Sequence, residues 1–209
     1  SQGRWRDSNL VRWFDDTLRP IGGWRTRSDT ASAGQVRGMH SWIANNSDRW
    51  ISAGSYNKLY VYSGAGIQYD ITPTGFTAGN EDALTPVGYG NSFYGLEYYG
   101  TPRQESVTIT PATTWSMDSW GQYLVACSST DGKVYEWQLS TGTIAAVVAN
   151  APVNNRAILV TEERFLMCLG AGGNPRLVQW SDREDNTVWT PAATNEAGSL
   201  ELQTTGRIQ

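Results

Sequence analysis

The sequence predicts an all-β protein made of repeated four-stranded units. The chain of 209 residues contains ten Trp, ten Tyr and 22 Gly. Its Gly and Pro residues fall between short runs rich in Val, Ile, Tyr and Trp, a pattern typical of β-strands joined by tight turns. No window has apolar residues at the spacing i, i+3, i+4 and i+7 that an amphipathic helix requires. We therefore expect few helices.

A pair of strands occurs three times along the chain. In each copy a strand led by an aromatic residue is followed by a turn and by a second strand that ends in an aromatic residue. The leading residues are Trp50, Tyr123 and Phe165, and the closing residues are Tyr62, Trp137 and Trp180. Equivalent positions in equivalent strands are expected to be buried alike, so Trp137 and Trp180 are both predicted to lie in the core.

One further strand precedes each pair and another follows it, so each unit is predicted to contain four antiparallel strands. The units cover residues 36–71, 113–148 and 156–190, and Thr187–Thr190 is the last strand of the third. The dipeptide Asp131-Gly132 is a strong hairpin signal, because a tight primed turn needs the positive φ that Gly and Asp tolerate. The second and third leading aromatic residues are 42 residues apart, which is a normal blade length for a propeller.

We therefore predict a β-propeller-like array of four-stranded antiparallel blades, with three full blades and partial blades at both ends. Residues 9–21 are expected to form an N-terminal hairpin, and residues 200–204 the start of a further blade. These fragments either complete a fourth blade together or belong to further blades of a longer chain. The second alternative is favoured, because the fragments supply only about three strands and most propellers close with more blades.

The ends of the sequence support the same expectation. The chain begins at Ser1 without a methionine and stops at Gln209, just after a strand-like run. We expect both ends to be cut from a longer chain, so that residues 1–209 form a single β-propeller or part of one.

An insertion at residues 79–106 explains why the first two leading aromatic residues are 73 residues apart. It is rich in Gly and aromatic residues, which give adaptable contact area at low entropic cost, as at many binding sites. Its alternatives are a floppy loop or a loop packed on the propeller face. The candidate partner-contact residues are Tyr89, Phe93, Tyr94, Tyr98 and Tyr99.

The sequence does not favour an enzyme. The single histidine, His40, falls inside a predicted strand, and the chain has no Gly-x-Ser-x-Gly nucleophile elbow. The two cysteines, Cys127 and Cys168, are expected to be free, buried and apolar in behaviour. No catalytic, metal-binding or cofactor-binding residue is predicted, and no cofactor is expected.

Acidic residues occur in four clusters, and a glycosidase needs two carboxylates at a defined separation. Three of the clusters fall in predicted turns, where acids commonly bind water or the backbone, and the fourth falls in the insertion. The clusters are Asp15-Asp16, Glu81-Asp82, Glu162-Glu163 and Asp182–Asp185. The last belongs to Ser181–Trp189, which resembles the Asp-box of sialidases and related propellers, a hairpin that stabilises the fold and carries no catalysis.

Charge and hydropathy restrict the partners. The formal net charge is −4, which argues against a general nucleic-acid binder. No apolar run approaches the eighteen or so residues needed to cross a bilayer, so no membrane span is expected.

Several motifs resemble those of tailed-phage virion proteins. They are Trp5-Arg-Asp, Val11-Arg-Trp-Phe-Asp15, Arg19-Pro-Ile-Gly-Gly-Trp24, Trp120–Cys127, Asp131–Trp137, Val178–Asp182 and Trp189-Thr-Pro191. The chain is similar in these motifs to the propeller-bearing tail nozzle proteins, or packaged-DNA stabilisation proteins, of short-tailed phages.

This resemblance implies a structural protein of the virion tail that is made in the host cytoplasm and forms a hexameric ring with other copies of itself. It also implies contacts with the adaptor and fibre proteins, and with DNA that is retained in the tail and passed through a lumen. The alternative is a carbohydrate-binding propeller whose Trp and Tyr side chains stack on sugar rings. A propeller glycosidase is a weaker alternative.

Overall fold

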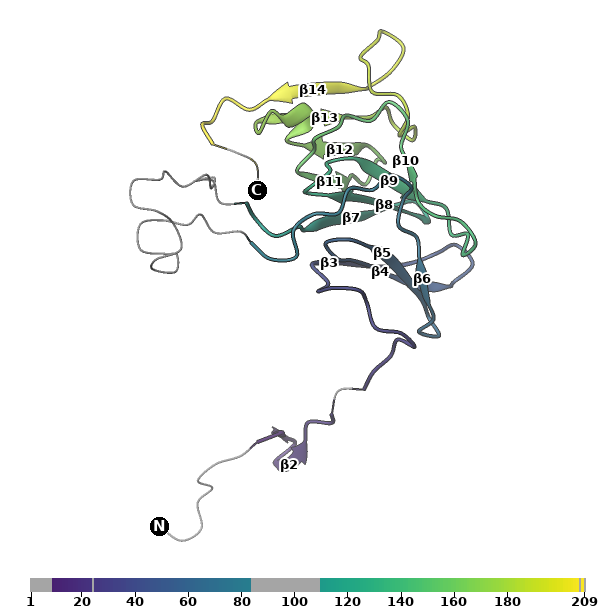
Figure 1. The fold of residues 1–209 in the computed structure, drawn as a ribbon, viewed down its shortest axis with the longest axis vertical. Coiled ribbons are helices and arrows are strands. Elements are labelled where there is room, and N and C mark those ends of the chain that lie inside the picture. Colours follow the sequence, from purple (N-terminus) through teal and green to yellow (C-terminus); the bar gives the residue numbers. More distant parts are fainter. Residues whose placement is uncertain (1–8, 24, 84–109, 207, 209) are drawn as a thin grey trace, which may run out of the picture.

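The structure is a computed structural model that describes residues 9–23, 25–83, 110–206 and 208. These residues form three four-stranded antiparallel sheets and one separate two-stranded ribbon (Figure 1). Their only helical element is a single 3-10 turn at Ala171–Gly173. The prediction of an all-β protein with four-stranded antiparallel sheets is confirmed. None of the described segments forms an apolar helix long enough to cross a membrane.

Each sheet consists of four strands that follow one another in the sequence and lie in that order in space. Sheet 1 contains β3 (Gly38–Ile43), β4 (Arg49–Gly54), β5 (Leu59–Ser63) and β6 (Gln68–Asp70). Sheet 2 contains β7 (Trp115–Trp120), β8 (Tyr123–Ser128), β9 (Val134–Trp137) and β10 (Ala146–Val147). Sheet 3 contains β11 (Ala157–Val160), β12 (Leu166–Leu169), β13 (Leu177–Trp180) and β14 (Gly198–Glu201).

The last strand of sheet 3 differs from the prediction. β14 pairs with β13 and places Leu200 opposite Val178, so the strand expected to begin a further blade is the fourth strand of sheet 3. The predicted strand Thr187–Thr190 belongs instead to a folded turn, in which the N–H of Asp182 donates to the carbonyl of Val188 (2.9 Å). The turn buries Trp189, which is 3% exposed, in the core between sheets 2 and 3, and burial of a large aromatic side chain stabilises this arrangement.

The position of Trp180 is also different from the prediction. In sheet 2, Trp137 pairs with Leu124 and is 1% exposed. In sheet 3, Trp180 pairs with Met167 and is half-buried on the opposite face of its sheet. Side chains alternate between the two faces of a strand, so a shift of one position exchanges the faces. Trp180 is therefore not the core equivalent of Trp137.

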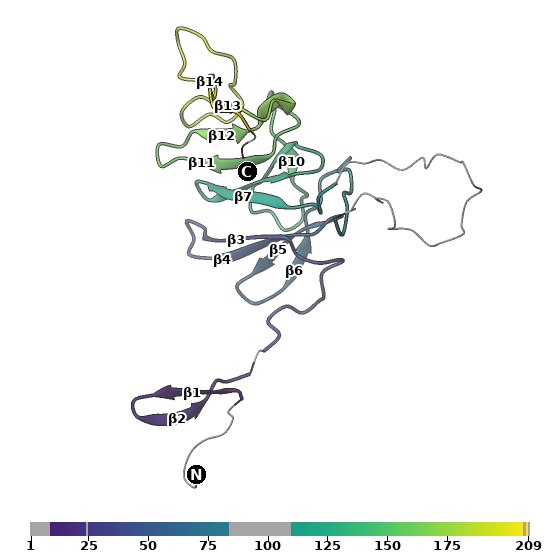
Figure 2. The same ribbon diagram turned by 90° about the vertical axis from the view of Figure 1, so that its left-hand side faces the viewer.

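The first strands of the three sheets lie together in the middle of the molecule. In both Figure 1 and Figure 2, β7 lies between β3 and β11, and β14 lies at the far side of sheet 3 from sheet 2. Because sheets 1 and 3 each pack on one face of sheet 2, sheet 2 is covered on both faces.

Two apolar cores hold the sheets together. The core between sheets 1 and 2 is rich in tryptophan: the ring centroid of Trp137 lies 6.4 Å from that of Trp42 and 5.2 Å from that of Trp50. Edge-to-face pairs of this kind add to the free energy gained from burial. The core between sheets 2 and 3 contains Trp120, Val125, Cys127, Val134, Val148, Ile158, Leu166, Cys168, Ala171 and Trp189.

Polar side chains of β7 close the free edge of β11. The Ser116 hydroxyl donates to the carbonyl of Ile158 (2.7 Å) and accepts from its N–H (3.1 Å). The Asp118 carboxylate accepts from the N–H of Val160 (2.8 Å). An exposed strand edge is a template for unwanted pairing, and here the neighbouring sheet satisfies it.

The ribbon formed by β1 (Val11–Phe14) and β2 (Thr17–Pro20) stands apart from the sheets (Figure 2). Its two strands pair across Asp15 and Asp16, whose φ angles are 51° and 55°. Positive φ at both central residues is the requirement of a type I′ hairpin turn, whose twist matches that of the strands.

Candidate functional site

The partner-contact residues predicted from the sequence are Tyr89, Phe93, Tyr94, Tyr98 and Tyr99. They all fall within residues 84–109, which lie outside the described part of the chain. The remaining candidates can be placed, and they lie in different parts of the molecule.

His40 lies on β3, at the contact between sheets 1 and 2. Its Nε2 atom is 2.8 Å from the Ser119 hydroxyl, and its ring stacks on Trp42 with centroids 5.9 Å apart. No acidic side chain is within hydrogen-bond distance of the ring among the described residues. His40 therefore joins two sheets and has no partner of the kind that activates a catalytic histidine.

The acidic clusters do not converge on a common site. Asp15 and Asp16 form the turn of the ribbon, and Asp82 pairs with Arg37 (2.8 Å) beside sheet 1. Glu162 and Glu163 lie in the turn between β11 and β12. A pair of carboxylates flanking one pocket, as glycoside hydrolysis requires, does not occur among these clusters.

The fourth cluster stabilises the turn that follows β13. The Asp182 carboxylate accepts hydrogen bonds from the N–H groups of Arg183 (2.9 Å) and Glu196 (2.8 Å). The Asp185 carboxylate accepts from the N–H (2.9 Å) and the hydroxyl (2.6 Å) of Thr187. These bonds hold the pKa of Asp185 below its usual value of 3.8, and the hydroxyl of Thr187 has the largest effect. Both carboxylates therefore serve the local turn.

Both cysteines are free and buried in the core between sheets 2 and 3. Burial raises the pKa of Cys127 to about 12 and also raises the pKa of Cys168. The thiolate is the form that attacks electrophiles and binds metals, so neither residue can act as a nucleophile near neutral pH. The described residues contain no group of three or more His, Cys, Asp or Glu side chains that could hold a metal ion.

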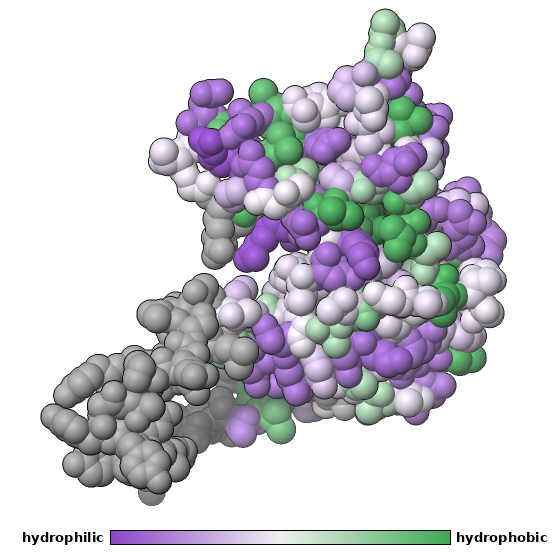
Figure 3. All heavy atoms as spheres, turned by 45° about the horizontal axis from the view of Figure 1, so that its top comes forward, coloured by the Kyte–Doolittle hydropathy of each residue, from purple (hydrophilic) through white to green (hydrophobic). Residues whose placement is uncertain are grey.

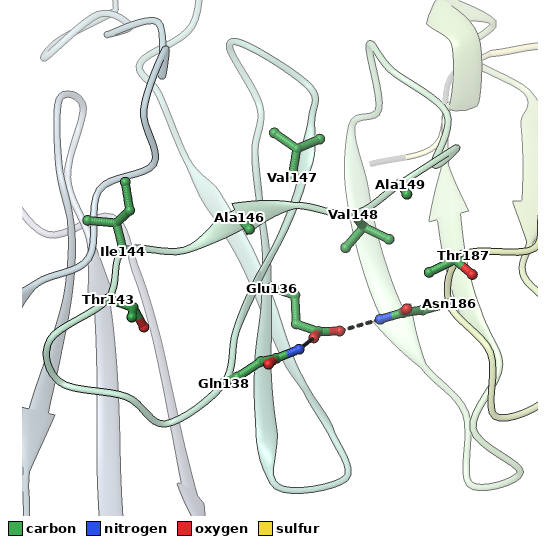
Figure 4. A pocket seen from close by; sticks show the side chains of 10 residues that line it. All are labelled: Glu136, Gln138, Thr143, Ile144, Ala146, Val147, Val148, Ala149, Asn186 and Thr187. Carbon is green, nitrogen blue, oxygen red and sulfur yellow. Dashed lines mark hydrogen bonds between the residues drawn. The ribbon is translucent and has the colours of Figure 1, made fainter.

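A pocket of about 390 Å³ lies where the outer strands of sheet 2 meet the turn after β13. Figure 4 shows Glu136 of β9 at its centre, reaching toward Asn186 across the boundary between the sheets. The Glu136 carboxylate accepts hydrogen bonds from the side-chain amides of Gln138 (2.7 Å) and Asn186. Thr143, Ile144, Ala146, Val147, Val148, Ala149 and Thr187 complete the wall.

The chemistry of this pocket is that of a structural contact. Glu136 is its only ionisable lining residue, and each of its carboxylate oxygens accepts one amide hydrogen bond. A binding site needs several convergent polar groups, whereas the one carboxylate here already joins two sheets. The sequence analysis did not identify this pair, because Glu136 and Asn186 are 50 positions apart and meet only through the packing of two sheets.

A shallower hollow of about 330 Å³ lies on the face of sheet 3 that is turned away from sheet 2. Phe165, Met167 and Trp180 supply an apolar wall, and Glu163 and Glu196 supply carboxylates. Aromatic rings beside polar groups are suited to a sugar ring or to a protein surface. Trp180 was predicted to lie in the core, so this surface was not expected from the sequence.

Apolar side chains reach the surface in several patches, which appear green in Figure 3. One patch belongs to the ribbon and its flank, where Leu10 is 72%, Trp13 66% and Phe14 54% exposed. Arg12 and Arg19 lie over the Phe14 ring, 5.7 and 5.1 Å from its centre. Sheet 1 exposes Met39 and Ile43, and sheet 3 exposes Leu200.

No protein-family model matches the chain, and neither a curated protein nor a solved structure is significantly similar to it.

Proposed function

We propose that this protein is a structural component of a bacteriophage tail, of the nozzle type, in which the three sheets are blades of a β-propeller. The arrangement of the sheets supports the propeller. Sheets that follow one another in the sequence pack face to face, and the first strand of each, β3, β7 and β11, contacts the next. Propeller blades surround their axis in this way.

The observation that carries the structural role is the exposed ribbon. An isolated two-stranded hairpin is only marginally stable in water, and this one presents Trp13 and Phe14 to solvent with Arg12 and Arg19 beside them. Aromatic residues and arginine are the residues that most often dominate the binding energy of protein interfaces. The ribbon is therefore suited to pack on a neighbouring subunit.

In this proposal the ribbon joins copies of the protein into a ring beside the adaptor and fibre proteins of the tail. The ring helps to retain packaged DNA and to pass it at ejection. The protein is made in the host cytoplasm and works in the virion as a non-enzymatic part. The assignment to a tail comes from the sequence resemblance, and the exposed ribbon supports assembly.

Electron microscopy of the purified protein tests the ring. We expect six- or twelvefold rings, and we expect Trp13→Ser to abolish them because it removes the largest side chain of the ribbon. Ile144→Ser is the matched control, since Ile144 is 47% exposed in the segment that precedes β10 and is far from the ribbon in sequence. Particles that never form rings, or rings that survive Trp13→Ser, would contradict the proposal.

The hollow on sheet 3 favours a second candidate function, carbohydrate binding. The half-buried rings of Phe165 and Trp180 beside Glu163 resemble the combination of stacking surface and hydrogen-bond acceptor that a sugar needs. A glycan array is the direct measurement. Binding that disappears in Trp180→Ala and persists in Trp13→Ser would favour this candidate over the tail.

A further inference from the structure

Sheets 1 and 3 each have one face that no other sheet covers in the described part of the chain. Sheet 2 is the reference for what such faces contain when they are buried. Its face toward sheet 1 carries Leu124, Ala126, Tyr135 and Trp137, all of them almost completely buried. The open face of sheet 1 occupies the equivalent position in its own sheet.

The open face of sheet 1 matches the buried face of sheet 2 residue by residue. The strand registers align Met39, Ala53 and Tyr60 in one row and Ser41, Ile51 and Tyr62 in the next. In sheet 2 the corresponding rows are Met117, Ala126 and Tyr135, and then Ser119, Leu124 and Trp137. Four of the six positions are identical, and the other two exchange Ile for Leu and Tyr for Trp.

Part of this face is already covered within the chain. The Tyr60 hydroxyl accepts a hydrogen bond from the N–H of Ala33 (3.2 Å), and Tyr60 is 6% exposed. The edge strand β3 is uncovered, with Met39 67% and Ile43 62% exposed, whereas Ala53 of β4 is 2% exposed. A face with the composition of a buried sheet surface is therefore available for a further sheet.

The open face of sheet 3 is wholly apolar along its strands. The registers place Ala157, Leu169, Val178 and Leu200 in one row and Leu159, Met167, Trp180 and Gly198 in the next. The equivalent face of sheet 2 packs on sheet 3. There, Asp118 stands at the position of Leu159, so the open face of sheet 3 is more apolar than the face that sheet 2 already buries.

Charges at the ends of the two open faces are complementary. Arg49 and Arg27 line a hollow of about 430 Å³ on sheet 1, and neither pairs with a carboxylate among the described residues. Glu163 lies exposed at the rim of sheet 3, beside Phe165. Arg183 lies over the Phe165 ring, 6.0 Å from its centre, but it pairs with Glu196 (2.7 Å) and is neutralised there. Opposite charges placed across an interface favour the matching pair of surfaces and disfavour others.

The contact between sheets 2 and 3 gives the expected alignment. Arg164, which precedes the leading residue Phe165, lies over the ring of Trp120 on sheet 2, 5.2 Å from its centre. Arg49 holds the same position before Trp50 in sheet 1. An equivalent contact would direct Arg49 toward the end of sheet 3 that carries Glu163 and Phe165.

We propose that the open face of sheet 1 in one copy of this chain packs on the open face of sheet 3 in a second copy. The reverse contact forms at the same time, and the two copies close a ring of six sheets, a blade number within the range of propellers. Each contact is head to tail, because it joins two different surfaces, sheet 1 of one copy and sheet 3 of the other. A twofold rotation relates the copies, so the two contacts together close the ring. The inference rests on the propeller part of the proposed function and is independent of the tail, although a twelvefold ring would then contain six such pairs.

Light scattering with size exclusion measures the association. We expect a mass of twice the 23.0 kDa chain. Met39→Asp/Ile43→Asp alters sheet 1 alone, and Met167→Asp/Leu200→Asp alters sheet 3 alone. Each double variant is expected to be monomeric, and an equimolar mixture of the two should form a mixed pair through the one intact contact. Ile144→Asp, at an exposed site in the segment that precedes β10, should leave the pair unchanged.

Association in the mixture distinguishes a contact between sheet 1 and sheet 3 from other ways of covering the two open faces. A protein that is monomeric at all concentrations, or variants that fail to associate in the mixture while far-UV circular dichroism shows them folded, would overturn the proposal. A mixture in which only the sheet 3 variant pairs with itself would show that sheet 1 binds sheet 1. Rings in the microscope that persist in both variants would overturn this contact and leave the tail role intact.

Charge reversal gives a second test that leaves the apolar faces untouched. Arg49→Glu and Glu163→Arg are each expected to weaken the pair at least roughly fivefold, because each places like charges at both contacts. The double variant Arg49→Glu/Glu163→Arg should restore the dissociation constant, since residue 49 of one copy meets residue 163 of the other. A double variant that is weaker than both single variants would contradict the alignment.

Discussion

Sheets 2 and 3 start from nearly the same sequence pattern and bury different residues. Both have an aromatic residue followed by leucine at the start of the second strand, Tyr123-Leu124 and Phe165-Leu166, and both have a tryptophan at the end of the third. Trp137 is buried between sheets 1 and 2, and Trp180 lies on an open face. Trp137 follows Leu124 by 13 positions and Trp180 follows Leu166 by 14 positions, and a difference of one position exchanges the two faces of a strand.

The turn between the second and third strands sets which residue of β13 lies opposite Leu166. Six residues separate the paired Cys127 and Val134 in sheet 2, and eight separate Leu169 and Val178 in sheet 3. The two extra residues move β13 along β12, so Ser181 takes the place opposite Leu166 that Trp137 takes opposite Leu124. The Ser181 hydroxyl accepts from the N–H of Leu166 (3.1 Å).

A residue from outside the strands replaces the missing tryptophan. Trp189, from the turn after β13, fills the core between sheets 2 and 3, and its indole N–H donates to the carbonyl of Asn186 (2.7 Å). Sheet 3 therefore buries a large aromatic side chain as sheet 2 does, but it takes that side chain from a turn. This exchange leaves Trp180 free for the open face.

The largest expected effect separates the two tryptophans. Trp137→Ala should lower the free energy of unfolding by about 3 to 5 kcal/mol, because it leaves a cavity between two sheets. Trp180→Ala should lower it by about 1 kcal/mol, since the half-buried indole loses only part of its contact area. Urea denaturation measures both values, and the Met39→Asp/Ile43→Asp background removes any contribution from self-association.

Equal losses for the two variants would show that Trp180 is buried as Trp137 is, and the register of β13 would then be wrong. Trp189→Ala completes the comparison. It should lower the free energy of unfolding about as much as Trp137→Ala does, because Trp189 is 3% exposed.

The positions of most strands could be predicted from the sequence, but the face of the sheet on which each side chain lies could not. Alternating apolar residues and Gly-containing turns identified all four strands of sheets 1 and 2, because these signals are local. The face of Trp180 depends on the register of β13 against β12, and the fourth strand of sheet 3 depends on the competition between Thr187–Thr190 and β14 for the edge of β13. Both are decided by packing between distant segments, which local patterns do not encode.

The candidate surfaces were less predictable than the fold. The Tyr/Gly-rich insertion was identified by composition and remains a prediction. The open faces of sheets 1 and 3 could have been found by writing the four strands of each unit in register and comparing Met39, Ser41 and Ile51 with Met117, Ser119 and Leu124. That comparison requires the register, and the register of sheet 3 was the part that the sequence could not supply.

A smaller difference in unfolding free energy is expected between variants at the contact of sheet 2 with sheet 3 and variants at its contact with sheet 1. Asp118→Ala should lower the free energy of unfolding by about 1 to 3 kcal/mol, because it leaves the N–H of Val160 without its acceptor at a part-buried site. His40→Ala, at the contact with sheet 1, removes one hydrogen bond to Ser119 and should lower it by about 0.5 to 1.5 kcal/mol. Thermal unfolding by calorimetry measures both, and a larger loss for His40→Ala would reverse the ranking of the two contacts.

The smallest expected effect concerns the pH dependence of the turn that supplies Trp189. The hydroxyl and N–H of Thr187 hold the pKa of Asp185 below 3.8 in the folded protein, so the unfolded chain binds this proton more readily. The stabilisation is therefore fully present above the unfolded pKa and is lost as the pH falls through the folded pKa. Asp185→Asn should lower the melting temperature slightly at pH 6, and the difference from the unmodified protein should shrink below about pH 3.8. Asp48→Asn, in the exposed turn between β3 and β4, is the matched control. A difference that grows as the pH falls would mean that the folded turn prefers protonated Asp185, and that the carboxylate does not hold Trp189 in place.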